Sequence, residues 1–298
     1  MLAVEADRPT RALDPPRAIR PFLVSRGGDI RLRYHERRPP LAVKGERLFD
    51  SGGVWHVERT RGGLRYSFRI RNRRPPLYKV VTIDEALVAG TLHFDATPRG
   101  PHYALDYPLD ELLFQHRLAR EGAVEVHGCG VVWQGRTLLF CGRSGAGKST
   151  TARLWKRHAR GARLLSDDRV VLRPGKRSVR AYGTPWHGDG GFASPTSAPL
   201  GALFFLRHGK ATRLRPLSRA EAAARLFTRC FPPPWDREGV ARALDACADA
   251  AARVPAFELS FRPRSEAVAA VRALVEQKRK PTNKRTDNKP TTGQGVLD

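Results

Sequence analysis

One glycine-rich stretch, LLFCGRSGAGKST at residues 138–150, limits the possible folds of this chain more than any other feature. Its core, residues 142–149, fits the phosphate-binding pattern GxxxxGK(S/T), in which successive backbone N–H groups point at a polyphosphate. Hydrophobic patterning predicts a buried strand before it, over residues 137–140, and a helix after it, over residues 151–160. Because strand, loop and helix in this order are the setting that the motif requires, the sequence predicts a nucleoside triphosphate site.

Each residue type in the loop has a physical role in holding phosphate. Glycines permit the tight turn and the close approach of the backbone to the ligand. Lys148 would reach the outer phosphates as a positive charge, and the Ser149 hydroxyl would bind Mg²⁺ at the helix amino terminus. The predicted nucleotide-binding residues are Gly142, Arg143, Ser144, Gly145, Ala146, Gly147, Lys148, Ser149 and Thr150.

Two acidic residues lie in the apolar segment LLSDDRVVL, residues 164–172, which we predict to be one strand. Burying carboxylates is costly unless a cation or hydrogen bonds compensate. Asp167 and Asp168 are therefore candidates for holding Mg²⁺ and for positioning or deprotonating a nucleophile. The next glycine-rich stretch, residues 181–192, carries Trp186, His187 and Asp189, and we expect a loop that lines a site, with a plain connection as the alternative.

Composition indicates a globular protein, because 41% of the 298 residues are hydrophobic. No apolar run reaches the roughly 18 residues that a membrane span needs, and the first residues do not resemble a secretory signal, so we expect a cytoplasmic protein. The net charge of +25 is spread through nearly every segment without a known nucleic-acid-reading motif, so nucleic acid is not the favoured partner. The four cysteines lack the spacing of a zinc site or a disulfide framework, and we predict buried thiols.

Changes in pattern along the chain predict its domain organisation. Alternation over residues 54–59 and 66–71, with Gly-Gly pairs between strands, predicts hairpins of an antiparallel sheet. The arginine-rich face of the second hairpin is either a solvated face or a docking surface for an acidic partner. The predicted parts are a flexible arm (1–20), a small β-rich subdomain (21–104), a larger α/β domain around the glycine-rich loop (105–277) and a disordered basic tail (278–298).

Within the larger domain, local signals predict further helices and strands. Pro108 opens a helix that Gly122 ends, and Ser218 with Glu221 forms a capping box before another. The remaining predicted strands are residues 124–133, 203–206 and 256–261, and the remaining helices are residues 236–253 and 264–277.

Three linked motifs resemble a known family. They are His127 with Gly128, the loop at 142–149, and the apolar strand Leu164–Val170 that contains DDRV. Together they resemble the catalytic domain of the HPr kinase/phosphorylase family, over roughly residues 105–275. The resemblance implies an α/β fold with a mixed, twisted sheet and a phosphate loop, like that of phosphoenolpyruvate carboxykinase. It also implies ATP, Mg²⁺ and transfer of a phosphoryl group to a hydroxyl.

Carried over residue by residue, the resemblance implies a catalytic set of Asp167, Asp168, His127 and Lys148. One of the two aspartates would be the acid or base, and His127 would lie beside the transferred phosphate. The implied metal ligands are Ser149 and Asp168, with Asp189 as the candidate for the family's downstream acidic ligand, which has no match in its usual setting. The region linked to phosphorolysis and the family's regulatory domain also have no match, so the chain resembles a divergent, stand-alone relative.

Three functions remain open at this point. The first is an ATP- and Mg²⁺-dependent kinase for a serine-type hydroxyl of a protein, peptide or small molecule, with an acidic acceptor as one option. The second is a carboxykinase-like lyase, since the implied fold is shared. The third is a nucleotide-dependent binding or regulatory module without turnover. The sequence also leaves open whether the chain forms a homo-oligomer.

Overall fold

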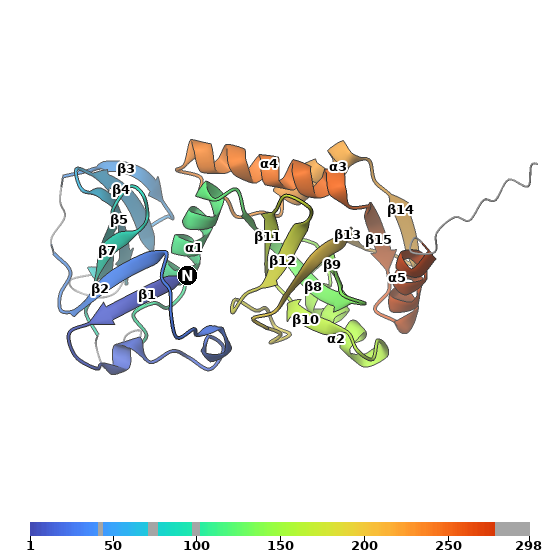
Figure 1. Ribbon diagram of the computed structural model, residues 1–298, viewed down its shortest axis with the longest axis horizontal. Helices are drawn as coiled ribbons and strands as arrows, with labels where there is room; N and C mark the ends of the chain where they lie inside the picture. The colour runs from blue at the N-terminus through green and yellow to red at the C-terminus, as the bar shows by residue number, and fades with distance from the viewer. Residues whose placement is uncertain (41–43, 71–76, 97–101, 278–298) are drawn as a thin grey trace, which may run out of the picture.

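The structure, a computed structural model, describes residues 1–40, 44–70, 77–96 and 102–277. It is an α/β protein with two mixed β-sheets, which Figure 1 shows as two lobes connected by helices α1 (Leu109–Arg120) and α4 (Arg237–Arg253). The tail predicted to be disordered, residues 278–298, lies outside the described residues. In the described ranges no helix combines the length and the apolar character needed to cross a membrane.

The amino-terminal sheet has seven strands in the order β1-β2-β7-β6-β5-β4-β3. The predicted antiparallel arrangement holds for the hairpins from β3 to β7, but β1 pairs with β2 in parallel and β2 pairs with β7 in parallel. The strands are β1 (Leu2–Ala6), β2 (Ile30–Glu36), β3 (Glu46–Asp50), β4 (Trp55–Thr60), β5 (Gly63–Arg69), β6 (Leu77–Ile83) and β7 (Ala89–Phe94).

The flexible arm predicted over residues 1–20 is wrong in its first part. This segment contains β1 and the short 3₁₀ helix Arg11–Leu13, and a second 3₁₀ helix begins at Arg20. Leu2, Val4 and Ala6 pack against the hydrophobic core of the amino-terminal lobe. Five residues are too few to show a clear period in a stretch dominated by proline and arginine, and only tertiary pairing with β2 reveals the strand.

The prediction of an arginine-rich surface on the second hairpin is only partly correct, because one arginine of this face is buried. Arg65 on β5 is only 1% exposed. Its guanidinium group donates hydrogen bonds to the Pro40 carbonyl, at 2.8 Å, and to Ser67 Oγ, at 3.3 Å. Arg65 is thus an internal group that ties the β2–β3 connection to the sheet, whereas Arg69 at the end of the strand is exposed.

The carboxy-terminal sheet is mixed and lies between two helical layers. Its order is β10-β8-β11-β12-β13-β15-β14, with β9 paired to both β8 and β13. Buried side chains of α2 (Lys148–His158) and α5 (Ser265–Gln277) cover one face, and those of α3 (Arg219–Phe227) and α4 cover the other. The strands are β8 (Val124–Trp133), β9 (Arg136–Cys141), β10 (Arg163–Ser166), β11 (Arg169–Pro174), β12 (Val179–Gly183), β13 (Ser197–His208), β14 (Arg213–Pro216) and β15 (Ala256–Phe261).

The predicted continuous strand over residues 164–172 is interrupted at its two aspartates. Both halves run antiparallel to β8, with β10 beside residues 130–132 and β11 beside residues 124–127. Between them the Asp168 carbonyl still accepts a hydrogen bond from the Gly128 amide, at 3.0 Å. Irregular backbone at this point frees the two carboxylates from the alternation of a regular strand.

Helix α1 lies between the two lobes and contacts both. The prediction placed it in the larger domain, but Leu109, Leu112 and Leu113 belong to the core of the amino-terminal lobe. His116 of the same helix contacts both lobes, with Nδ1 at 2.7 Å from Tyr66 Oη of β5 and Nε2 at 3.0 Å from Asp236, the amino-terminal cap of α4. A hydrogen-bonded chain therefore connects the amino-terminal sheet with α4.

Candidate functional site

The glycine-rich loop connects β9 with α2 at the carboxyl end of β9. Gly145 and Gly147 have φ angles of +78° and +99°, a region that favours glycine. A Cβ atom at Gly142 would lie 2.6 Å from the Ala146 Cβ, so this position also requires glycine. Because helix α2 begins at Lys148, the amides of its first turn have no intrahelical acceptor and lie directly after the loop. This geometry fits an anion at the helix terminus.

The Lys148 side chain folds back onto the loop that precedes it. It is 6% exposed, and its Nζ donates to the carbonyls of Gly142 and Arg143, both at 3.3 Å. Its Nζ also lies 3.6 Å from Asp168 Oδ1. Burial lowers the pKa of the Lys148 ammonium group, while the Asp168 charge raises it, and burial has the larger effect. The loop therefore holds a cation next to the acidic pair.

Asp167 is fully buried and is held by the loop after β12. Ser149 Oγ donates to Asp167 Oδ2 at 2.6 Å. Backbone amides of Gly188, Gly190 and Phe192 donate to the same carboxylate at 3.0, 2.8 and 3.3 Å. Four hydrogen bonds compensate for removing this carboxylate from water. The predicted glycine-rich loop thus contributes backbone amides to the site.

Asp168 lies among positively charged and hydrogen-bonding side chains. Its Oδ1 is 2.9 Å from His127 Nε2 on β8, and its Oδ2 contacts Arg169 Nη1. Burial raises the pKa of Asp168, but the hydrogen bond with His127 and the charges of Arg169 and Lys148 together outweigh it, so the pKa lies below the ordinary value. Asp168 is therefore ionised at neutral pH, and its carboxylate is partly exposed (25%).

Arg169 joins Asp168 to two further acidic residues. Its Nε lies 2.8 Å from Glu111 Oε1, on α1, and 3.1 Å from Glu125 Oε1, on β8. Its guanidinium carbon lies 4.2 Å from the centre of the Phe231 ring, which also contacts His127. Burial, and then the neighbouring Glu111, raise the pKa of Glu125 well above its ordinary value. The acidic pair positions Arg169, and Arg169 positions Asp168.

The structure brings together most of the predicted site residues. Ser149 lies with Asp167, and Lys148 and His127 lie with Asp168. Asp189 is exposed, and among the described residues its carboxylate contacts no other predicted site residue. The backbone amides of Gly188 and Gly190, on either side of Asp189, point inward to Asp167 instead. Within the same ranges no cluster of three or more His, Cys, Asp or Glu side chains forms a ready metal site.

Sequence reasoning did not assign roles to several residues that the structure places here. Glu111 and Glu125 lie in predicted elements, but nothing in the local pattern shows that both face Arg169. His208 Nε2, at the carboxyl end of β13, lies 2.9 Å from the Gly145 carbonyl of the loop. A polar residue at the carboxyl end of an apolar strand, next to a strand that carries the loop, was the available signal for His208.

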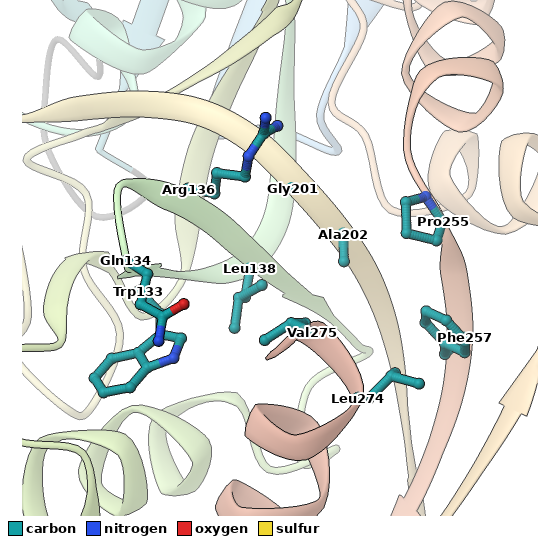
Figure 2. A pocket seen from close by; sticks show the side chains of 10 residues that line it. All are labelled: Trp133, Gln134, Arg136, Leu138, Gly201, Ala202, Pro255, Phe257, Leu274 and Val275. Atoms are coloured by element: carbon teal, nitrogen blue, oxygen red, sulfur yellow. The ribbon is translucent and has the colours of Figure 1, made fainter. Parts of the chain in front are cut away.

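A separate cavity lies at the opposite end of the same sheet. Its volume is about 550 Å³. Figure 2 shows Leu138, Phe257 and Leu274 in its walls, and Arg136 is the charged residue among the described residues that line it. Strand β9 starts beside this cavity and ends at the glycine-rich loop, so roughly 15 Å separates the two at about 3.3 Å per residue. The cavity is therefore distinct from the polar site.

Comparisons with known proteins do not show which family this chain belongs to. No family model matches the sequence, and no curated protein matches it. Among solved structures, the Hpr(Ser) kinase/phosphatase from Coxiella burnetii is similar to 52% of this chain and 93% of its own, with 13% sequence identity and a TM-score of 0.30. A likeness this weak adds no support to a fold or an activity. The architecture itself defines the class, an α/β protein of two mixed sheets.

Proposed function

We propose that this protein is a kinase that transfers the γ-phosphate of ATP to a serine-type hydroxyl. The observation that carries the proposal is the different environment of two adjacent aspartates. Asp167 accepts hydrogen bonds from the Ser149 hydroxyl and from backbone amides, whereas Asp168 contacts His127, Lys148 and Arg169. Phosphoryl transfer needs both kinds of carboxylate, one for metal and one for the hydroxyl proton.

Residues around the loop fit a nucleotide and its metal ion. The Ser149 hydroxyl and the Asp167 carboxylate, 2.6 Å apart, are hard oxygen donors of the kind that Mg²⁺ prefers. Both would bind the ion. Because Asp167 already accepts four hydrogen bonds, the ion would take the place of the hydrogen bond from Ser149. This assignment differs from the sequence-based expectation, which named Asp168 and Asp189. When bound, Mg²⁺ supplies positive charge that offsets the charge of the phosphates.

Asp168 would act as the base. The acceptor oxygen forms its bond to the γ-phosphorus as the bond to the β-phosphate oxygen breaks, and the hydroxyl proton passes to Asp168. A carboxylate has about four lone-pair positions, so the contacts with His127 and Arg169 leave room for this proton. His127, 2.9 Å from Asp168, would hold the carboxylate in position, and the positive charge of Lys148, 3.6 Å from Asp168, would stabilise the transferred group.

The proposal is tested by measuring Mg-ATP affinity and transfer of labelled γ-phosphate to acceptors in an extract of the source cells. We expect Asp168→Asn to lower transfer by about 10²-fold or more with little change in affinity. Asp167→Asn should lower Mg-ATP affinity, and His127→Ala should slow transfer more than it weakens binding. The exposed Asp245→Asn serves as a matched control.

Equal transfer in all four proteins would refute the catalytic assignment. Intact Mg-ATP binding without any transfer by the parent protein would instead favour a nucleotide-dependent binding module. Lys148→Ala tests whether the loop is the ATP site. Loss of the Lys148 charge should weaken ATP binding while the thermal melting profile stays close to that of the parent. Unchanged ATP binding in Lys148→Ala would show that the loop is not the nucleotide site.

A further inference from the structure

A large cavity lies between the two lobes, beside the candidate site. Its volume is about 800 Å³, in the range of ligand-binding pockets. Its walls come from β1, the segment before β2, helix α1 and the loop after β12. Most of its lining is apolar, with Val4, Ile19, Phe22, Phe114, Leu118 and Trp186 among its residues.

The cavity borders the free edge of a β-sheet. β1 is the outermost strand of the amino-terminal sheet, so its outer edge has no strand partner in the described part of the chain. Consecutive side chains of a strand point to opposite faces. All residues from Met1 to Val4 nevertheless line the cavity, so the cavity meets the edge of the strand and not one face. An exposed edge can pair with an extended peptide through main-chain hydrogen bonds.

The charged residues that line the cavity indicate which side chains a bound peptide would carry. Arg117 and Arg173 both contact one carboxylate, Glu121. Arg26 lines the same cavity, is exposed, and has no ion pair within the residues that the structure describes. Asp29 is already paired with the terminal amine. With Asp110, the lining carries three carboxylates against three arginines and the terminal amine, so positive charge exceeds negative charge by one, which favours acidic side chains in a ligand.

The first turn of α1 connects the cavity to the candidate catalytic residues. Asp110 lines the cavity, and its Oδ2 accepts a hydrogen bond from Trp186 Nε1 at 2.9 Å. The next residue, Glu111, contacts Arg169, which contacts Asp168. Trp186 is also two residues before Gly188, whose amide binds Asp167. The cavity therefore stops short of the two aspartates, and Glu111 and Arg169 lie between its Asp110 wall and Asp168.

We propose that the cavity binds the phosphoryl acceptor as an extended peptide segment that pairs with the outer edge of β1. Aliphatic side chains of the peptide fill the space between the lobes, and acidic side chains meet the arginines. A hydroxyl residue further along the peptide, outside the cavity, extends past Trp186 toward Asp168. Peptide binding is inferred from the cavity, the free edge of β1 and the arginines. That the peptide is the phosphoryl acceptor rests on the kinase function proposed above.

Random decapeptides displayed on phage, selected on the full-length protein without nucleotide, test this inference. We expect enrichment of peptides that combine aliphatic and acidic residues. The exposed Leu23 and Val24 line the cavity, and Leu23→Glu with Val24→Glu should weaken binding of a synthetic enriched peptide about tenfold or more through repulsion and loss of apolar contact. Leu244→Glu, on the exposed face of α4, is the matched control and should bind as the parent does.

Different results separate the two proposals. Failure to enrich any peptide, enrichment of basic peptides, or equal binding by the Leu23/Val24 variant would overturn the peptide site. Enriched peptides that contain serine are then incubated with labelled ATP. Binding that depends on Leu23 and Val24 without phosphorylation would leave the peptide site standing and remove the kinase. Phosphorylation that the Leu23/Val24 variant does not reduce would leave the kinase and remove the cavity as its acceptor site.

Discussion

Asp167 and Asp168 have the same side chain and adjacent positions, but their neighbours give them different properties. Neutral donors surround Asp167, namely one hydroxyl group and three amides. Positive charges from Arg169 and Lys148 face Asp168. The hydrogen bond with His127 and then the charge of Arg169 hold the pKa of Asp168 below its ordinary value, because opposite charges interact more strongly in a partly buried site than in water. The same property can be measured in the pH dependence of the reaction.

Arg169→Met should shift the acid limb of the pH profile of phosphoryl transfer to higher pH. The reason is that loss of a neighbouring positive charge raises the pKa of Asp168, so the carboxylate is protonated at a higher pH. Arg169→Lys keeps the charge and should keep the acid limb near its original position. Both proteins are compared by circular dichroism to confirm folding. An unchanged acid limb in Arg169→Met would show that Asp168 is not the group that titrates.

At the scale of elements, the loop after β12 acts through its backbone. Gly188 and Gly190 bring two amides to Asp167, and a Cβ atom at Gly190 would lie 2.5 Å from Asp167 Oδ2. Glycine is required there because of this close approach, and not because of a positive φ angle. The loop therefore sets the position of the proposed metal-binding carboxylate, although no side chain of the loop contacts it among the described residues.

Gly190→Ala should weaken Mg-dependent ATP binding by about tenfold or more, because the methyl group displaces Asp167 and costs a hydrogen bond to a charged group. The measurement is a titration of ATP at several Mg²⁺ concentrations. Gly62→Ala is the control, since a Cβ at Gly62 meets no atom within 4 Å. Equal ATP affinity in Gly190→Ala and the parent at every Mg²⁺ concentration would contradict the role of the loop.

At the scale of the whole molecule, the two lobes are joined through α1 and the start of α4. The Tyr66–His116–Asp236 chain crosses this junction, and the Trp235 ring packs against Trp55, Tyr66 and His116. Figure 1 shows α4 extending from the carboxy-terminal sheet toward the amino-terminal lobe. Burial, and then the charge of Arg120, lower the pKa of His116 from 6.5 to about 4.

The depressed pKa of His116 predicts acid sensitivity of this junction. Between pH 6.5 and 4 the unfolded chain binds a proton at His116 that the folded protein does not, so stability from this group falls as the pH falls. The stability gap between the parent and His116→Gln should therefore narrow from pH 7 to pH 5, by about 2 kcal/mol. Urea denaturation at both pH values measures it. A gap that is the same at both values would show that His116 is not buried in its neutral form.

Much of the fold was open to prediction from the sequence, because its signals are local. The period of apolar residues predicted β8, β9, β15, α1, α4 and α5, and the structure confirms them within a few residues. Ser218 caps α3 and accepts a hydrogen bond from the Glu221 amide, as the capping pattern predicted. Each of these features depends on residues within about one turn or one strand of each other.

Tertiary structure alone decided the arrangement of the candidate site and the boundary between the lobes. His127 meets Asp168 across 41 residues of sequence, and Glu111 meets Arg169 across 58. Strand β1 forms by pairing with a strand that follows it by more than 20 residues, and α1 has its leucines in one lobe and its acidic residues facing the other. The sequence could identify the loop and the two aspartates, since residue type and spacing suffice for them. It could not assign their separate roles, because those depend on neighbours that only the folded chain brings within hydrogen-bonding distance.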